Sequence, residues 1–156
     1  MNLIKKRILI TAGEPASISS EITIKAIKKL KKESNSELIL ITDPSLIKQE
    51  IKNLNKSDEL NILDEKLNFK NYKTDFINII PIKLSEKTIP GILNKKNSDF
   101  VLKSIKMSAD FLLQKKANAV VTNPINKFIM KSSNFKFNGH TEYLGHLSKF
   151  NKKPIM

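Results

Sequence analysis

The chain has 156 residues, of which 40% are hydrophobic, enough for one ordinary domain with a packed core. It contains no cysteine, which excludes disulfides, thiolate nucleophiles and cysteine-based metal sites. Its formal net charge of +13 raises binding to nucleic acid or to a membrane surface as an alternative function.

The pattern of charged residues indicates that the net positive charge reflects amino-acid composition and not a binding function. Arg7 is the only arginine, although arginine is the preferred residue for bidentate contacts with phosphates and bases. The lysines are scattered among many Ile and Asn residues, a bias that AT-rich codons produce without functional pressure. No apolar run reaches the 18 residues of a membrane span, and residues 1–10 do not resemble a signal peptide. We therefore expect a cytoplasmic protein without a membrane partner, and we disfavour nucleic acid as a partner.

Apolar runs separated by capping and turn residues predict alternating strands and helices. In the first half the expected elements are a strand at 8–10, a helix at 19–32, a strand at 38–41, a helix from Asp43-Pro44 to 54, a short strand at 61–63, and a strand pair or extended run at 76–84 broken by Pro81.

In the second half we expect a loop at 87–97, the longest helix at 98–116, a strand at 119–121, a short helix at 125–131, a loop at 132–139, a helix at 141–150 and the start of a strand at 154–156. The buried face of the longest helix is expected to hold Val101, Leu102, Ile105, Ala109, Leu112 and Leu113. Strands that alternate with helices indicate an α/β fold with a mostly parallel sheet, whose ligands bind beyond the carboxyl ends of the strands.

Two motifs follow strand ends. The first, Thr11–Glu21, leads from a strand into a helix, where backbone N–H groups can hold an anion. Its alternative is an ordinary connection with Gly13 as the turn residue, and it lacks the G-x-G-x-x-G pattern. The second, Val121–Lys127, brings Thr, Asn and Lys to one rim, where Lys127 either binds a phosphate or carboxylate or is a solvated lysine.

The third motif is Gly139-His140-Thr141-Glu142. We expect the imidazole of His140 to be accessible for hydrogen bonding, acid–base chemistry or metal binding, whereas in the alternative it is a loop histidine. Thr141 either contacts a substrate or only caps a helix. His146 does not form an i, i+4 pair with His140, and we interpret it as a surface residue.

Together, Gly13-Glu14-Pro15-Ala16, Pro124-Ile125-Asn126-Lys127 and Gly139-His140-Thr141-Glu142 resemble the 4-hydroxythreonine-4-phosphate dehydrogenase family across essentially the whole chain. The resemblance implies NAD-dependent oxidation of 4-phosphooxy-threonine, with loss of CO₂ from the ketone, in pyridoxal 5′-phosphate synthesis. It also implies a three-layer α/β/α fold like that of isocitrate and isopropylmalate dehydrogenases, a homodimer, and a divalent metal bound by histidines.

The resemblance carries His140 and Thr141 over as substrate-binding residues. Asn126, Lys127 and Glu14 are expected at the rim of the active site, and no catalytic residue is assigned. Ser17, Ser19 and Ser20 replace two glycines and a proline of the family loop, which bears on the geometry of that loop.

Family members are roughly twice as long as this chain, so the resemblance implies a truncated N-terminal half. Residues 1–127 are expected to form an incomplete first domain, and residues 128–156 the start of a second one. The metal-binding histidines, most phosphate-binding residues and the NAD site are expected beyond the end of the chain, so no metal ligand is assigned within it. The alternatives to part of an enzyme are an inactive remnant or a basic nucleic-acid-binding module.

Overall fold

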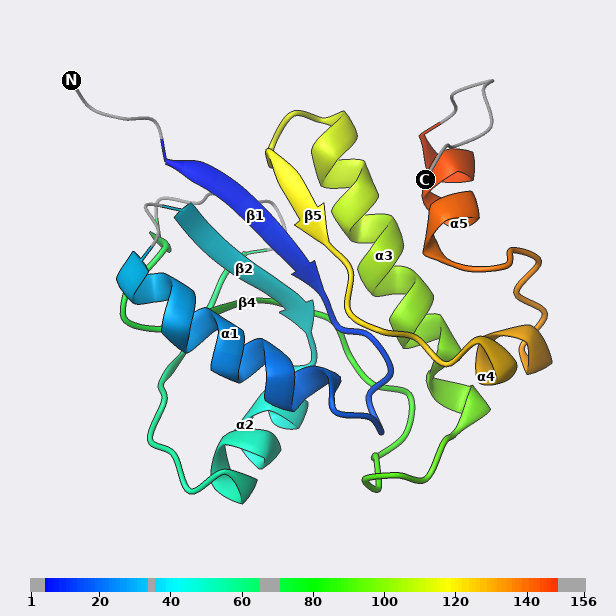
Figure 1. The fold of residues 1–156 in the computed structure, drawn as a ribbon, viewed down its shortest axis with the longest axis horizontal. Helices are drawn as coiled ribbons and strands as arrows, with labels where there is room; N and C mark the ends of the chain where they lie inside the picture. The colour runs from blue at the N-terminus through cyan, green and yellow to red at the C-terminus, as the bar shows by residue number, and fades with distance from the viewer. Residues whose placement is uncertain (1–4, 34–35, 65–70, 149–156) are drawn as a thin grey trace.

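The computed structural model describes residues 5–33, 36–64 and 71–148, which build an α/β/α sandwich around a five-stranded sheet (Figure 1). The strands are β1 (Lys6–Thr11), β2 (Ser36–Thr42), β3 (Leu60–Ile62), β4 (Ile77–Pro81) and β5 (Ala119–Val121). The helices are α1 (Ser19–Glu33), α2 (Pro44–Asn53), the 3-10 turn η2 (Lys95–Asn97), α3 (Ser98–Leu113), α4 (Lys127–Ser132) and α5 (His140–Leu147). All the strands pair in parallel, in the order β3-β4-β2-β1-β5.

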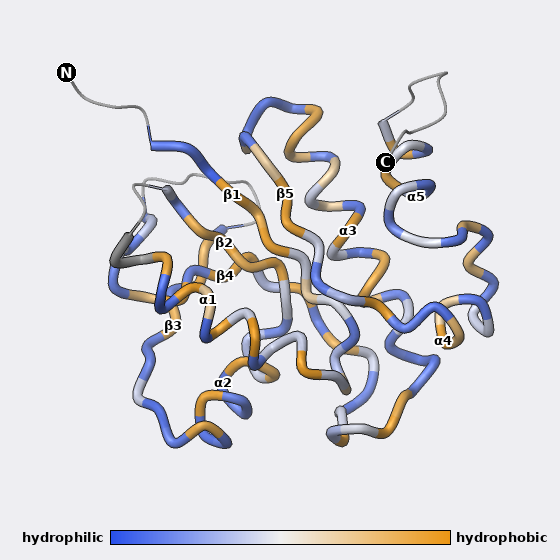
Figure 2. The backbone as a smooth tube through the Cα atoms, viewed as in Figure 1, coloured by the Kyte–Doolittle hydropathy of each residue, from blue (hydrophilic) through white to orange (hydrophobic). Residues whose placement is uncertain are grey.

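Helices cover both faces of the sheet, so the inner strands are apolar on both sides, as a parallel sheet requires. Along β2, Ile39 packs in the core beneath α3, while Leu40 packs in the core beneath α1 and α2. Both side chains are essentially inaccessible to solvent. Figure 2 shows the central strands as the most continuous hydrophobic segments of the chain. The expected three-layer fold is therefore confirmed.

The start of α2 follows the expected capping pattern. Asp43 accepts hydrogen bonds from the backbone N–H of Ser45 at 2.8 Å and from its hydroxyl at 2.6 Å, and Pro44 opens the helix. The second carboxylate oxygen of Asp43 accepts from the N–H of Leu84 at 2.8 Å. One side chain thus joins the helix to the segment that follows β4.

Two expectations about the middle of the chain need correction. Of the two alternatives for residues 76–84, the strand pair is wrong: a single extended strand, Ile77–Pro81, forms and pairs with β2 and β3. Pro81 is tolerated because it is the last residue of β4, past the end of the pairing with β3. In α3, Leu113 is 54% exposed, while Phe100 and Phe111 are buried with the expected Val101. Leu113 lies off the apolar stripe that faces the sheet.

The C-terminal elements begin and end at slightly different residues than expected. The helix α3 ends at Leu113, because Lys115 adopts a left-handed φ of 56° that ends the helical hydrogen-bond pattern. Asn126 is the N-cap residue of α4, so this helix starts at Lys127 and not at the expected residue 125. The expected strand at 154–156 lies outside the described residues. The last helix, α5, begins at His140 and ends at Leu147, before the expected residue 150, with Ser148 at its C-cap. α5 packs near α3, and the proposed domain boundary at residue 127 stays a prediction.

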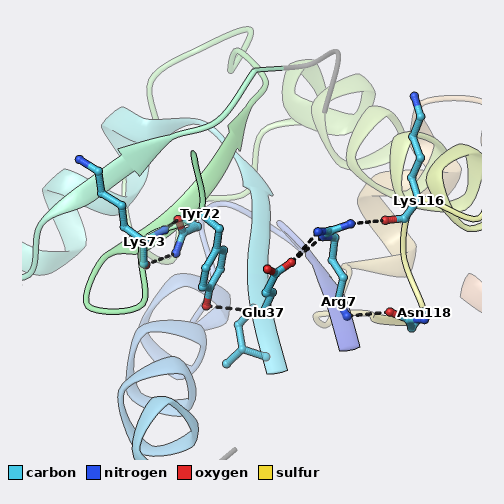
Figure 3. Close-up of polar contacts among 8 residues, drawn as sticks. Arg7, Glu37, Tyr72, Lys73, Lys116 and Asn118 are labelled. Atoms are coloured by element: carbon cyan, nitrogen blue, oxygen red, sulfur yellow. Dashed lines mark hydrogen bonds and ion pairs between the residues drawn. The ribbon is translucent and has the colours of Figure 1, made fainter. Parts of the chain in front are cut away.

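At the amino-terminal ends of the central strands, Arg7, the only arginine of the sequence, connects neighbouring segments. Arg7 donates from Nε to Glu37 on β2 at 2.8 Å and from Nη1 to the carbonyl of Lys116 at 2.9 Å (Figure 3). Its backbone N–H donates to the side chain of Asn118 at 2.7 Å. Arg7 therefore ties β1 to β2 and to the residues that precede β5. Within the described residues, no helix is long and apolar enough to cross a membrane.

Candidate functional site

The first two motifs emerge side by side at the carboxyl edge of the sheet. β1 and β5 are neighbours, with Ile10 opposite Val121, so the segments after them leave the sheet together. The segment after β1 continues into α1 and the segment after β5 into α4, so the two segments diverge from adjacent strand ends (Figure 1). Such an edge is where α/β proteins place their ligands.

Asn123 fastens these two segments together. Its N–H donates to the hydroxyl of Thr11 at 3.0 Å, and its side-chain amide donates to the carbonyl of Thr11 at 2.8 Å. The same amide donates to the hydroxyl of Thr23, on α1, at 2.6 Å. Asn123 is only 7% exposed, so these bonds form away from water, where leaving a polar group unpaired is costly. The residue therefore has one well-defined position.

The first loop passes very close to the second motif. Gly13 has a φ of 71°, and a Cβ there would lie 2.7 Å from Cβ of Asn123 and 2.8 Å from the carbonyl oxygen of Pro124. The N–H of Glu14 donates to that same carbonyl at 2.9 Å. Only glycine combines this backbone conformation with this close approach.

The serines that replace the family's glycines fit without left-handed backbone. The positive φ values among the described residues fall at Gly13 and Gly91 and at three non-glycine positions outside this loop. The hydroxyl of Ser17 donates to the carbonyl of Glu14 at 2.8 Å and lies 2.8 Å from the hydroxyl of Ser19. These local hydrogen bonds fix the conformation of the loop, which therefore does not need glycine at these positions.

Glu14, expected at the rim, is a buried carboxyl group. It is 4% exposed, and its Oε1 accepts from the N–H of Ala16 at 3.2 Å. Burial raises the pKa of the Glu14 carboxyl, and the hydrogen bond from Ala16 offsets only part of that effect. The charged form is therefore less favoured than in water.

The third motif folds back onto the second. The ammonium-bearing end of Lys127 lies against Gly139, with its Cε 3.5 Å from the place of a Cβ on that glycine. His140 interacts with the backbone of Asn123. Burial and the charge of Lys127 lower the pKa of His140, and the backbone of Asn123 offsets part of this shift. His140, Lys127 and Asn123 thus form one cluster at the end of β5.

The imidazole of His140 is less accessible than the sequence indicated. The residue is partly buried, and its Nε2 atom is buried without a hydrogen-bond partner among the described residues. Thr141 follows in the first turn of α5 and is also partly buried. Gly139, and not Thr141, occupies the N-cap position of this helix.

Two other residues have local structural roles. The side chain of Asn126 accepts from the N–H of Ile129 at 3.0 Å and so caps α4. His146 is exposed, and its ring lies 5.0 Å from that of Phe137, so the interpretation as a surface residue is confirmed.

The described residues provide no obvious site for a metal or a dinucleotide. They contain no group of three or more His, Cys, Asp or Glu side chains placed to hold a metal ion. The loop after β1 has Gly13 alone in place of a glycine-rich phosphate loop. A cavity of about 660 Å³, lined by residues including Asp43, Ser45 and Lys83, lies instead beyond β2 and β4.

The sequence pointed to the three motifs but not to the residues that join them. Thr11 and Thr23 gave no signal of their own, since a threonine at a strand end or in a helix is common. Asn123 was visible as a polar residue at a strand end. Its buried role depends on contacts with Thr11, 112 positions away in the sequence, which no local pattern reveals.

An α/β/α sandwich with a polar cluster at the carboxyl edge of a parallel sheet is the architecture of many nucleotide- and metabolite-binding enzymes. The family model described as "Pyridoxal phosphate biosynthetic protein PdxA" matches residues 33–156, and the chain belongs to this family.

Individual relatives agree with the family match. The chain is 35% identical over 150 residues to the 4-hydroxythreonine-4-phosphate dehydrogenase of Wigglesworthia glossinidia brevipalpis, covering 96% of this chain and 44% of that relative. The crystal structure of the enzyme of that name from Klebsiella pneumoniae is 26% identical, with a TM-score of 0.78 over 92% of this chain and 44% of its own. The one from Burkholderia phymatum, at 22% identity, shares the fold with a TM-score of 0.85 over 96% and 46%. The chain thus spans less than half the length of these relatives.

Proposed function

We propose that this chain supplies the first part of an NAD-dependent 4-hydroxythreonine-4-phosphate dehydrogenase, which oxidises the secondary alcohol of 4-phosphooxy-threonine on the way to pyridoxal 5′-phosphate. The observation that carries the proposal is the cluster of His140, Lys127 and Asn123 at the carboxyl edge, beside the loop of Gly13. The family membership supports it.

In this proposal the chain binds and orients the substrate. Lys127 offers a positive charge to the phosphate or carboxylate, and the first turn of α5 adds backbone N–H groups that favour an anion. His140 and Thr141 contact the substrate directly. Asn126 and Glu14 shape the rim, the first by capping α4 and the second by fixing the loop after β1.

The cofactors belong to other parts of the enzyme in this proposal. The chemistry that NAD and a divalent metal would supply is that of a hydride acceptor and a Lewis acid. The described residues include no group of three side chains placed to hold a metal ion, and the loop after β1 lacks a glycine-rich dinucleotide pattern. We also propose that residues 1–127 belong to an incomplete first domain and residues 128–156 to the start of a second, in a cytoplasmic homodimer. The chain's own contribution is therefore binding and positioning.

A chimaera tests this function. Residues 1–156 are joined to the remaining part of one of the full-length relatives, and NADH formation is followed with 4-phosphooxy-threonine, NAD and a divalent metal. We expect turnover by the chimaera and none by residues 1–156 alone. His140→Ala and Thr141→Ala should raise KM about tenfold or more, because a hydrogen bond to a charged group contributes about 1.5–3 kcal/mol.

His146→Ala is the matched control, since this histidine lies on the same helix but its ring contacts that of Phe137 in a tilted arrangement. It should leave KM unchanged. If His140→Ala and Thr141→Ala lower the melting temperature but not the apparent affinity, the two residues are structural and their assignment fails. A chimaera that folds but never turns over would instead support an inactive remnant.

A further inference from the structure

One nitrogen of His140 lacks a hydrogen-bond partner in the part of the chain that the structure describes. Nε2 is buried and makes no hydrogen bond within the described residues, while the ring also interacts with the backbone of Asn123. Buried polar atoms in folded proteins almost always have partners, so an orphaned one marks a place where a bound molecule can provide it. Because Nε2 is the orphan, the nitrogen left to face Asn123 is Nδ1.

The backbone that faces His140 is unusually well fixed. Asn123 is tied to the end of β1 by two hydrogen bonds with Thr11 and to α1 by one with Thr23. It is followed by Pro124, whose carbonyl accepts from Glu14. A carbonyl group held in this way can select both the orientation of a neighbouring imidazole and which of its nitrogens carries the proton.

Resting on the function proposed above, we propose that Asn123 is a positioning residue. It holds His140 with the Nδ1 proton on its own carbonyl oxygen, so that Nε2 presents a lone pair to the secondary hydroxyl of the substrate. A neutral imidazole has one donor and one acceptor nitrogen, so a donor Nδ1 facing Asn123 makes the buried, unpartnered Nε2 the acceptor. Burial and Lys127 keep the ring in this neutral form by lowering the pKa of His140.

Two different side chains bind the reacting hydroxyl and the anionic end of the substrate. A phosphate at neutral pH offers mainly acceptor oxygens, which pair with the ammonium of Lys127 and not with a lone pair. A hydroxyl group can donate, and it therefore suits Nε2 of His140. His140 would then accept a hydrogen bond from the hydroxyl that reacts, and Lys127 would bind the phosphate.

The proton position can be measured on the whole chain without a ligand. The sequence has only two histidines, so long-range ¹H–¹⁵N NMR spectra of the imidazoles are assigned with His146→Gln alone. At pH 7.5 we expect His140 to be the Nδ1–H tautomer, with the exposed His146 in the same spectrum as the reference. An Nε2–H tautomer, or a pattern identical to that of His146, overturns the proposal.

A pair of variants tests the role of Asn123. Asn123→Ala removes the amide that ties the backbone to Thr11 and Thr23, and it should shift His140 toward a mixture of tautomers. Asn118→Ala is the matched control, because Asn118 bonds to Arg7 at the opposite end of β5. If both variants leave the His140 signals unchanged, or both change them equally, Asn123 is not a positioning residue. If Asn123→Ala unfolds, Thr23→Val removes one of the same bonds and takes its place.

Two probes test the hydroxyl contact. 4-Phosphooxy-threonine and O-phosphohomoserine share every charged group, and only the first has the secondary hydroxyl. We expect the first to move the Nε2 signal of His140 and to bind at least about fivefold more tightly, because the second leaves a buried acceptor unpaired. Equal affinities and equal shifts overturn the contact. If neither compound binds while His140 is the Nδ1–H tautomer, the proposed function fails for this chain and the positioning role of Asn123 stands.

Discussion

Two segments that are distant in the sequence approach each other closely at one residue, Gly13. Its left-handed backbone and its contacts with Asn123 and Pro124 let the loop after β1 lie directly on the segment after β5. The position tolerates no side chain, since a Cβ would also lie 2.6 Å from the hydroxyl of Ser19. The geometry of the candidate site therefore requires a residue without a Cβ atom at position 13.

We predict that Gly13→Ala destabilises the fold by more than about 2 kcal/mol, because a left-handed φ alone costs a non-glycine residue about 1–2 kcal/mol and the clash adds to it. Gly91→Ala is the matched control. Gly91 has a φ of 79° but no atom within 4 Å of its Cβ position, so only the backbone term applies. Urea unfolding of both variants gives the difference, and equal losses would show that the loop relaxes around the added methyl group.

His140 should make stability depend on pH. Its folded pKa lies below the ordinary value of 6.5, so the unfolded state takes up the proton first as the pH falls. Stability should therefore decline from pH 7.5 to 5, and His140→Gln should remove part of that decline, measured by denaturant unfolding across this range. His146→Gln should preserve it.

The effect of Glu14 on stability has the opposite pH dependence to that of His140. Because the pKa of Glu14 is raised in the folded state, its contribution to the free energy of unfolding is lost as the pH rises through that folded pKa. Both histidine variants retain Glu14, so its effect cancels in the comparison. A steeper pH dependence in His140→Gln than in the wild type would contradict the sign of the His140 shift.

Among the elements, α2 shows how one side chain can connect two of them. Asp43 caps the helix through Ser45 and also accepts from Leu84 after β4. Although burial raises the pKa of Asp43, these hydrogen bonds and the charge of Lys83 outweigh it and lower the pKa. The cap therefore stabilises the protein above the pKa of the unfolded state and is lost as the pH falls through the folded value.

We predict that Asp43→Ala costs about 2–3 kcal/mol of unfolding free energy, since it removes a helix cap and a charge-assisted bond to a second element. Asp99→Ala is the control, because Asp99 is also an acidic residue near a helix start but is exposed. Chemical denaturation at pH 7 measures both variants. A loss in Asp43→Ala no larger than in Asp99→Ala would show that Asp43 does not join α2 to β4.

At the scale of the whole molecule, one sheet separates two apolar cores. Ile39 belongs to the core under α3 and Leu40 to the core under α1 and α2. Because adjacent residues of one strand serve both cores, neither core can lose its packing without disturbing the other. The layers should therefore unfold as one unit.

We predict that Ile39→Ala and Leu40→Ala each destabilise the fold by about 2–5 kcal/mol, as large-to-small changes in a packed core do. Each should lower the protection of amides in α1 and in α3 alike, as measured by native-state hydrogen exchange. If Leu40→Ala affects α1 while α3 keeps its protection, the two layers are independent units.

The sequence by itself determined the local elements and the family motifs. The apolar run 119–121 is the strand β5, and Asp43-Pro44 opens α2, because short-range hydrophobicity and capping fix such features. The buried face of α3 was less well determined, since Leu113 and Phe111 are both apolar and only packing against the sheet decides which is buried.

The tertiary structure alone decided how the three motifs meet. The strand order places β1 beside β5 although more than 100 residues separate them, and this adjacency brings Asn123 to Thr11 and Glu14 to Pro124. The burial of Nε2 in His140 has the same origin, because the groups that surround it come from other parts of the chain. Local patterns carry no information about such pairings, since the free energy that selects them comes from burying both faces of the whole sheet.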